Sequence, residues 1–237
     1  MDKIDIINSF DKKKILLIGD TILDIYSHGR EVCRSSDSDA VEVEEDKISV
    51  SFGGASLVAS NILELGGRVI FFSMVGDDEA ARYYDNFNHP KLEKHFLVDK
   101  DRPTTVKKRF WAGDEKLFQA NQADNRYIGP SISKKMIKEI EPFIKNIDVM
   151  VVLDAQHGLL SKELTTDLIK LSKKYQKPIY VDSQISHRPS NHSLYGGADC
   201  LFFNQTEARA VLTNFDAQDL EESLKSLKEK FKLNNVV

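Results

Sequence analysis

The sequence predicts an α/β protein with a mostly parallel β-sheet, helices on both faces of that sheet, and a smaller β-sheet beside it. In the second half of the chain, amphipathic segments alternate with short apolar runs such as "DVMVVLD" and "PIYVDS", which is typical of parallel strands buried on both faces. Two stretches nearer the N-terminus alternate polar and apolar residues at period two, which indicates antiparallel hairpins with one solvent-exposed face. A chain of 237 residues can bury one sizeable core.

The main sheet is predicted to begin with two apolar runs, "KKILLIGD" at 13–20 and "RVIFFSMVG" at 68–76. The polar stretch that follows the first run has no clear period and is expected to be irregular. After the second run, "DDEAARYYDNF" opens with acidic residues, which favours a helix N-terminus at that point.

The smaller sheet is predicted to consist of two hairpins. "AVEVEEDKISVSF" indicates a hairpin within about 36–52 that turns at the charged residues 44–47. "TTVKKRFWAGDEKLFQAN" indicates a second hairpin at about 104–122 that turns at residues 112–114.

A glycine pair separates the first hairpin from a predicted helix. Gly53 and Gly54 precede a run with apolar residues at helical spacing, and Gly66 and Gly67 close it. Because glycine is unfavourable in both strands and helices, the pair suggests a close approach to the backbone. The apolar residues of this run are Leu57, Val58, Ile62 and Leu65.

The second half of the chain predicts a regular alternation of helices and strands. Its last residues, "KLNNVV", resemble the start of a further strand. The predicted helices are 131–145, 161–175, about 205–213 and 217–231, and the predicted strands are 148–154, 178–183 and 199–204.

Composition excludes several classes of partner. The net charge is −4, and basic and acidic residues are interspersed, so no clustered basic face for nucleic acid is expected. No run has the length and hydrophobicity of a membrane span or a signal peptide, so the protein is expected to be cytoplasmic. Cys33 and Cys200 are far apart and are expected to be separate thiols. His157, His187 and His192 are expected on loops or at the surface.

Polar residues recur where predicted strands end. Asp20, Asp154, Asp182 and Asn204 each follow an apolar run, and the carboxyl ends of parallel strands share one edge of a sheet. Each residue alone could simply cap the next helix, but the four together favour a polar ligand site. The sequence contains neither a strand-linked GxGxxG nor a GxxxxGK[ST] phosphate loop.

Five segments resemble the ribokinase/PfkB family of carbohydrate kinases, in order along almost the whole chain: "LIGDTILDIY", "GGASLVASNILELGG", "MVGDDEAARYY", "PTTVKKR" and "FFNQTEA". Within that family the heptose 7-phosphate kinase type is the most similar. The resemblance implies one ribokinase-like domain over 1–237, in which the two hairpins form a lid over a sugar or sugar phosphate. It also implies ATP and Mg²⁺ as cofactors and a homodimer through the lid, with contacts from Val41, Val43, Phe110 and Trp111.

The resemblance assigns roles to residues of the motifs. Asp20 and Asp24 would bind sugar hydroxyls, and Gly53 and Gly54 would lie under the sugar. Lys107 and Arg109 would present positive charge to the substrate, although an exposed strand face often carries such cations. The substrate site would also include Asn121 and Asp154. The phosphate end of ATP would meet Asp182, Asn204 and Glu207, with Glu207 near the metal; the plainer alternative is an Asn cap followed by a surface glutamate.

Several positions depart from the family pattern. Leu57 stands where the family has a sugar-binding Asn, and Gln119, Asn121, His157 and Gln184 stand where the heptose kinases carry charged residues. The family's G-A-G-D stretch, which supplies the catalytic base, does not occur, so the domain is expected to be incomplete after Val237, with no catalytic residue of its own. Two alternatives remain: an inactive sugar-binding or dimerisation module, and a nucleotide-dependent α/β enzyme of another family.

Overall fold

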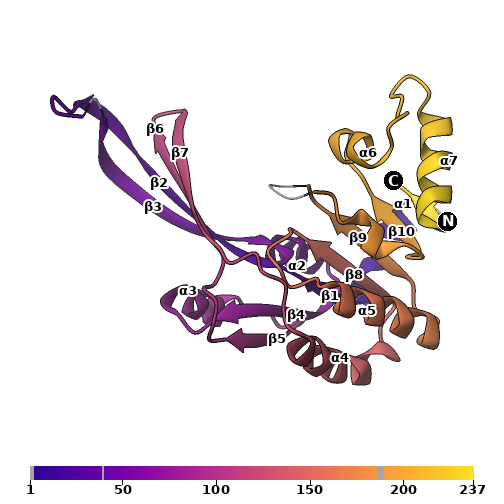
Figure 1. Ribbon diagram of the computed structural model, residues 1–237. Coiled ribbons are helices and arrows are strands. Elements are labelled where there is room, and N and C mark those ends of the chain that lie inside the picture. The colour runs from indigo at the N-terminus through magenta and orange to yellow at the C-terminus, as the bar shows by residue number, and fades with distance from the viewer. Residues whose placement is uncertain (1–2, 39, 186–188) are drawn as a thin grey trace.

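The computed structural model describes residues 3–38, 40–185 and 189–237, and it contains two β-sheets (Figure 1). Sheet A has seven strands in the order β11-β10-β9-β8-β1-β4-β5, all paired in parallel. This confirms the predicted parallel sheet. Its strands are β1 (Lys14–Gly19), β4 (Arg68–Gly76), β5 (Leu92–Asp99), β8 (Val149–Asp154), β9 (Ile179–Ser183), β10 (Cys200–Phe202) and β11 (Asn235–Val236).

Helices cover both faces of sheet A, as predicted (Figure 1). Alternate residues of β1 point to opposite faces: Leu16 and Ile18 belong to one hydrophobic cluster and Leu17 to the other. The first cluster is completed by α4 (Pro130–Ile144), α5 (Lys162–Tyr175) and α7 (Leu220–Phe231), and the second by α2 (Ala55–Glu64) and the turn η2 (Tyr83–Asn86). The remaining helical elements are α1 (Lys3–Ile7), η1 (Phe10–Lys12), α3 (Glu79–Arg82), η3 (His192–Tyr195) and α6 (Gln205–Val211).

Sheet B projects from the body of the molecule as a long flap (Figure 1). Its strand order is β3 (Val41–Gly54), β2 (Thr21–Arg34), β6 (Val106–Ala112) and β7 (Glu115–Gln122). Strands β2 and β3 are antiparallel, as are β6 and β7, while β2 and β6 run parallel in the middle. The second predicted hairpin forms, with its turn between Ala112 and Glu115.

The first predicted hairpin is wrong. Residues 44–47 lie inside the continuous strand β3, and the chain reverses instead between Arg34 and Val41. The partner of β3 is β2, in the stretch that was expected to be irregular. Because the outer part of β2 is exposed and carries polar residues on both faces, it lacks the alternation that identifies a half-buried strand.

Helix α2 forms where the glycine pair predicts it, and its most deeply buried side carries small residues. Leu57 and Leu65 are 53% and 60% exposed, whereas Ala55 and Ala59 are fully buried. The helix lies so close to β1 that a Cβ atom on Gly19 would be 2.8 Å from the Cβ of Ala55. Small side chains therefore face the sheet. Of the four apolar residues in the predicted run, Val58 and Ile62 pack against the second cluster, whereas Leu57 and Leu65 do not.

One of the predicted surface histidines is in the core. His192 is fully buried and stacks on Phe203 with 4.8 Å between ring centroids, and burial lowers its pKa to about 4. His157 is half-buried, and His187 lies outside the described residues. Both cysteines are free thiols, as predicted. Among the described helices none is long and apolar enough to span a membrane.

Candidate active site

Four of the predicted substrate-binding residues meet at the base of sheet B. The carboxylate of Asp24 on β2 pairs with Arg109 on β6, with 2.5 Å between Oδ1 and Nη1. The β2–β6 register places Lys107 directly opposite Asp24. The other oxygen of Asp24, Oδ2, lies against the α-carbon of Gly53 on β3. The structure therefore brings Asp24, Gly53, Lys107 and Arg109 into one cluster.

The charge of this cluster is positive. Lys107 is half-buried and forms no ion pair within the described residues, whereas the Arg109 charge is compensated by Asp24. Burial lowers the pKa of Lys107, Asp24 opposes that change and Arg109 adds to it. One carboxylate between two cations can accept hydrogen bonds from hydroxyl groups while the free ammonium attracts an anion.

The glycine pair is required by contacts within the protein. A Cβ atom on Gly53 would lie 2.1 Å from Oδ2 of Asp24, and one on Gly54 would lie 2.4 Å from the carbonyl oxygen of Asp20. Gly54 also has a φ of +57°, which strains any other residue. The immediate reason for both glycines is thus the placement of Asp24 and the chain reversal into α2.

Asp20 is separate from this cluster, because its carboxylate faces the loop after β8. It is only 4% exposed and accepts three backbone hydrogen bonds, from the N–H groups of Ala155, His157 and Leu159 at 3.1–3.2 Å. Burial and the charge of Asp154 raise the pKa of Asp20 to about 7, against the lowering effect of the three N–H donors. Asp20 thus clamps the end of β1 to this loop.

Asp154 is likewise engaged within the protein. It is 1% exposed, and its oxygens accept hydrogen bonds from the Tyr195 hydroxyl (2.6 Å), the Asn191 side chain (2.5 Å) and the Gln156 N–H (2.8 Å). Burial raises its pKa, and these hydrogen bonds partly offset the effect. The network ties the end of β8 to η3 and to Asn191, the residue directly before it.

The predicted nucleotide-side residues come together in a second place along the same edge. Asp182, Asn204 and Glu207 line one cavity of about 540 Å³ with Gln184. Asn204 caps α6: its Oδ1 accepts the Glu207 N–H at 2.9 Å, and a Glu207 oxygen accepts the Asn204 N–H at 2.8 Å. The cap that the plainer alternative expected is present, but Glu207 is buried instead of exposed at the surface, with 5% exposure.

A divalent cation fits the donor set of this cavity. Asp182 and Glu207 line the same cavity, and burial together with the charge of Glu207 raises the pKa of Asp182. Among the described residues, no three His, Cys, Asp or Glu side chains form a closed metal site. Mg²⁺ is often held by one or two carboxylates together with water and phosphate oxygens, and Asp182 and Glu207 could supply that share.

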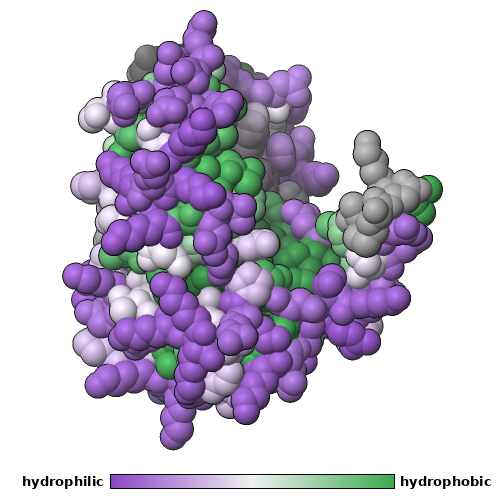
Figure 2. All heavy atoms as spheres, turned by 90° about the vertical axis from the view of Figure 1, so that its right-hand side faces the viewer, coloured by the Kyte–Doolittle hydropathy of each residue, from purple (hydrophilic) through white to green (hydrophobic). Residues whose placement is uncertain are grey.

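An apolar cavity of about 590 Å³ adjoins the polar one and shares Phe203, Asn204 and Val237 with it. The cavity lies between α6, α7 and the last residues of the chain. On the face of the molecule that Figure 2 shows, hydrophobic atoms are visible between hydrophilic side chains. A ligand with an anionic end and an uncharged ring could contact both cavities. The apolar residues that line this second cavity include Phe215, Leu220, Leu224, Leu227 and Val236.

The remaining predicted residues lie apart from both places or at their margins. Asn121 on β7 is exposed and accepts a hydrogen bond from the Gln119 side chain at 2.8 Å. The imidazole of His157 contacts the side chain of Asn125 at 2.8 Å. Leu57 is exposed on α2, so it removes a polar group without filling a core position.

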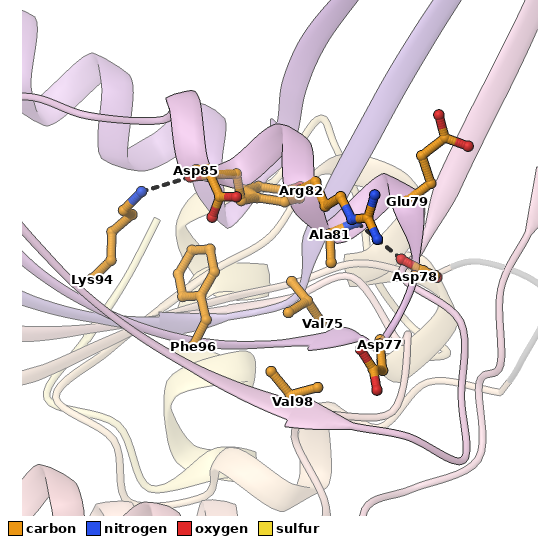
Figure 3. Close-up of a pocket in the computed structure, with 12 residues that line it drawn as sticks. Val75, Asp77, Asp78, Glu79, Ala81, Arg82, Asp85, Lys94, Phe96 and Val98 are labelled. Carbon is orange, nitrogen blue, oxygen red and sulfur yellow. Dashed lines mark hydrogen bonds between the residues drawn. The ribbon is translucent and has the colours of Figure 1, made fainter.

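A residue outside the predicted set supports the lid. Asp78 caps α3 by accepting the Ala81 N–H at 2.9 Å, and it accepts two more hydrogen bonds from the N–H and hydroxyl of Thr104 at 2.7 Å. These contacts fix the start of β6 to the main sheet. Figure 3 shows Asp78 at the rim of a cavity of about 590 Å³ between α3 and β5, which none of the predicted site residues lines.

The fold and this site define a class of protein, an α/β protein with a cluster of charged residues at the base of a β flap. Residues 12–237 match the family model described as pfkB family carbohydrate kinase, and the chain belongs to that family. This confirms the resemblance seen in the motifs and argues against an α/β enzyme of another family.

Relatives and solved structures agree on the fold. The chain is 30% identical over 227 residues to the bifunctional protein HldE of Campylobacter jejuni, covering 95% of this chain and 47% of that protein. Its structure resembles that of Escherichia coli phosphofructokinase-2, with a TM-score of 0.70 and 16% identity over 95% of this chain and 71% of that chain. It also resembles Arabidopsis thaliana ribokinase complexed with ribose and ATP, with a TM-score of 0.65 and 13% identity over 94% of this chain and 70% of that chain. The chain thus has a ribokinase-like fold and spans about half the length of the curated relatives it matches.

Proposed function

We propose that the protein takes part in ATP-dependent transfer of a phosphoryl group to a hydroxyl of a sugar or sugar phosphate. The observation that carries this proposal is the cluster of Asp24, Gly53, Lys107 and Arg109 at the base of the flap. The structural neighbour from Arabidopsis, complexed with ribose and ATP, supports ATP as the donor. Asp24 accepts hydrogen bonds from sugar hydroxyls, and Lys107 balances negative charge on the acceptor or the incoming phosphate.

Sheet B, with its antiparallel pairs β2–β3 and β6–β7, acts as a lid in this proposal. Closure of sheet B over the sugar excludes water from the transfer and brings Lys107 and Arg109 onto the substrate. Asp20 and Asp154 do not bind the sugar directly in this proposal, because their oxygens already accept hydrogen bonds from backbone and side-chain donors of the protein. Their role is to position the loop after β8 next to the sugar site.

The cavity of Asp182, Asn204 and Glu207 receives the phosphate end of ATP. Bound Mg²⁺ would neutralise charge on the transferred group, and Asp182 and Glu207 are the carboxylates that would hold it. The adjoining apolar cavity suits an uncharged ring of the nucleotide. We propose a cytoplasmic site of action, where ATP is available.

No residue of 1–237 is assigned as the catalytic base, since the G-A-G-D stretch does not occur in this sequence. We therefore propose that these residues supply the sugar site, the lid and part of the nucleotide site. The second candidate function is a sugar-binding module without phosphoryl transfer, which the exposed Leu57 in place of a polar sugar ligand favours.

A homodimer through the lid remains part of the proposal. Exposed strand edges are stabilised by pairing or packing with a second copy. Phe110 and Trp111 follow each other on β6 and project to opposite faces, so only one of them can enter a given lid contact. Phe110 stacks on Phe118 at 4.3 Å, on the face of sheet B that also carries the exposed Val50. Phe110 is therefore the better candidate, together with Val41 and Val43.

ADP release distinguishes the two candidate functions. The purified chain is incubated with ATP, Mg²⁺ and a panel of sugars and sugar phosphates, and binding of each sugar is measured in parallel by calorimetry. Sugar-dependent ADP release supports the kinase. Binding without ADP release supports the module, and the absence of both contradicts the sugar site.

A further inference from the structure

The inner face of sheet B carries three rows of side chains that cross all four strands. Strand pairing places directly opposite residues side by side on one face of the sheet. The base row is Ser51, Asp24, Lys107 and Asn121; the middle row is Ser49, Tyr26, Arg109 and Gln119; the outer row is Lys47, His28, Trp111 and Lys116.

Contacts between the rows show that they form one continuous surface. The Arg109 guanidinium lies over the Tyr26 ring at 5.1 Å from its centroid. The Tyr26 and His28 rings are 6.4 Å apart and inclined by 13°, and the His28 and Trp111 rings are 6.1 Å apart and inclined by 19°. On β7, Lys116 donates to Gln119 and Gln119 to Asn121, each at 2.8 Å.

The opposite face of the sheet has a different character. There Ile25 and Phe52 pack on the hydrophobic core, and Phe110 stacks on Phe118. The aromatic rings of the inner face are instead half-buried and continue outward from Asp24. They are flanked by exposed lysines and polar amides, the combination that contacts sugar rings and their charged substituents.

Charge and length determine what this surface can hold. The three rows contain four cationic side chains, Lys47, Lys107, Arg109 and Lys116, and a single carboxylate, Asp24. On β2, β3 and β6 the outer row lies four residues along the strand from the base row, or about 13 Å. On β7 a register shift opposite Phe110 and Trp111 adds one residue, and the hydrogen bond from Lys116 to Gln119 keeps Lys116 beside the same surface. That span exceeds one sugar ring held at Asp24, so the outer row meets a more distant part of a ligand.

We propose that the outer row is a second subsite, in which His28 and Trp111 stack on a ring and Lys47 and Lys116 bind an anionic group. The ligand is then a phosphorylated saccharide of at least two rings. The inference rests on the proposed function, because it takes the base row as the place where the sugar is held.

Trp111 is the only tryptophan of the chain, so its fluorescence reports on this subsite directly. Wild-type protein is titrated with glucose 6-phosphate and with trehalose 6-phosphate, followed by tryptophan emission and by calorimetry. The disaccharide phosphate is expected to bind about tenfold more tightly and to change the emission. The Trp111→Leu variant and the Lys47→Ala/Lys116→Ala double variant are expected to lose this preference while binding glucose 6-phosphate within twofold of wild type.

Phe118→Leu, on the opposite face, is the matched control and should keep the preference. Equal affinities for the two ligands in the wild type, or a preference that survives in both inner-face variants, would overturn the subsite. The proposed function survives failure of the subsite if glucose 6-phosphate binds to the wild type and Asp24→Ala removes that binding. If neither ligand binds, both proposals fail. A dimer that Trp111→Leu dissociates, without any ligand preference, assigns the outer row to a second copy and overturns the subsite.

Discussion

Replacement of Asp24 by alanine is expected to weaken the binding of sugars and sugar phosphates about 100-fold, equivalent to ~2.7 kcal/mol. The carboxylate is the single acceptor between Arg109 and Lys107, so its loss removes charge-assisted hydrogen bonds to hydroxyl groups and leaves two cations facing each other. Calorimetric titration of the variant measures the loss, and a melting curve establishes that the protein is still folded.

The sugar affinity of the Asp24→Asn variant should lie between those of the wild type and Asp24→Ala, because the amide keeps one acceptor oxygen and loses the charge. Asp46→Ala is a suitable control, since Asp46 is an exposed acid on the neighbouring strand β3. Wild-type affinity in Asp24→Ala would mean that sugars bind elsewhere on the molecule.

Replacement of Asp20 by alanine is expected to lower the free energy of unfolding by about 3 kcal/mol, which for a chain of this size lowers the melting temperature by roughly 6–12 °C. Three buried N–H groups of the loop after β8 lose their acceptor. Asp148→Ala is the matched control at the other end of β1, where an exposed carboxylate accepts one N–H from Lys14. Its melting temperature should stay close to that of the wild type, and an equal loss in both variants would contradict the clamp.

The same carboxylate should make stability depend on pH. The pKa of Asp20 is about 7 in the folded protein, against about 4 in an unfolded chain. Between these values the folded state holds a proton that the unfolded state has released, so the free energy of unfolding falls as pH rises from about 4 to 7. The buried His192, whose pKa is lowered to about 4, acts in the opposite direction. The comparison is therefore wild type against Asp20→Asn, in which the fall with pH should be smaller; identical slopes would exclude this role of Asp20.

The sequence predicted the main sheet well because its strands are buried on both faces. Runs such as β1 and β8 are almost wholly apolar, and this pattern has few alternatives in a soluble α/β protein. Strand β5, at the edge of sheet A, mixes exposed and buried residues and was not predicted. Strand β2 was missed because its last five residues, 30–34, are all exposed and have no buried face.

The candidate site was only partly predictable for a related reason. The position of a polar residue after a strand shows where its side chain begins but not what it contacts. Asp24 and Asp20 are four residues apart, yet the first pairs with the lid and the second binds backbone N–H groups. The same holds for Asn204, where one short pattern serves as a helix cap and as part of a cavity.

Hydrogen–deuterium exchange with and without glucose 6-phosphate tests the location of the sugar site most directly, because it does not depend on phosphoryl transfer. Ligand-dependent protection is expected at the base of sheet B, in peptides that contain Asp24, Gly53 and Arg109, and in the loop after β8. Protection confined to the cavity of Figure 3, around Asp78 and Lys94, would contradict the proposed sugar site.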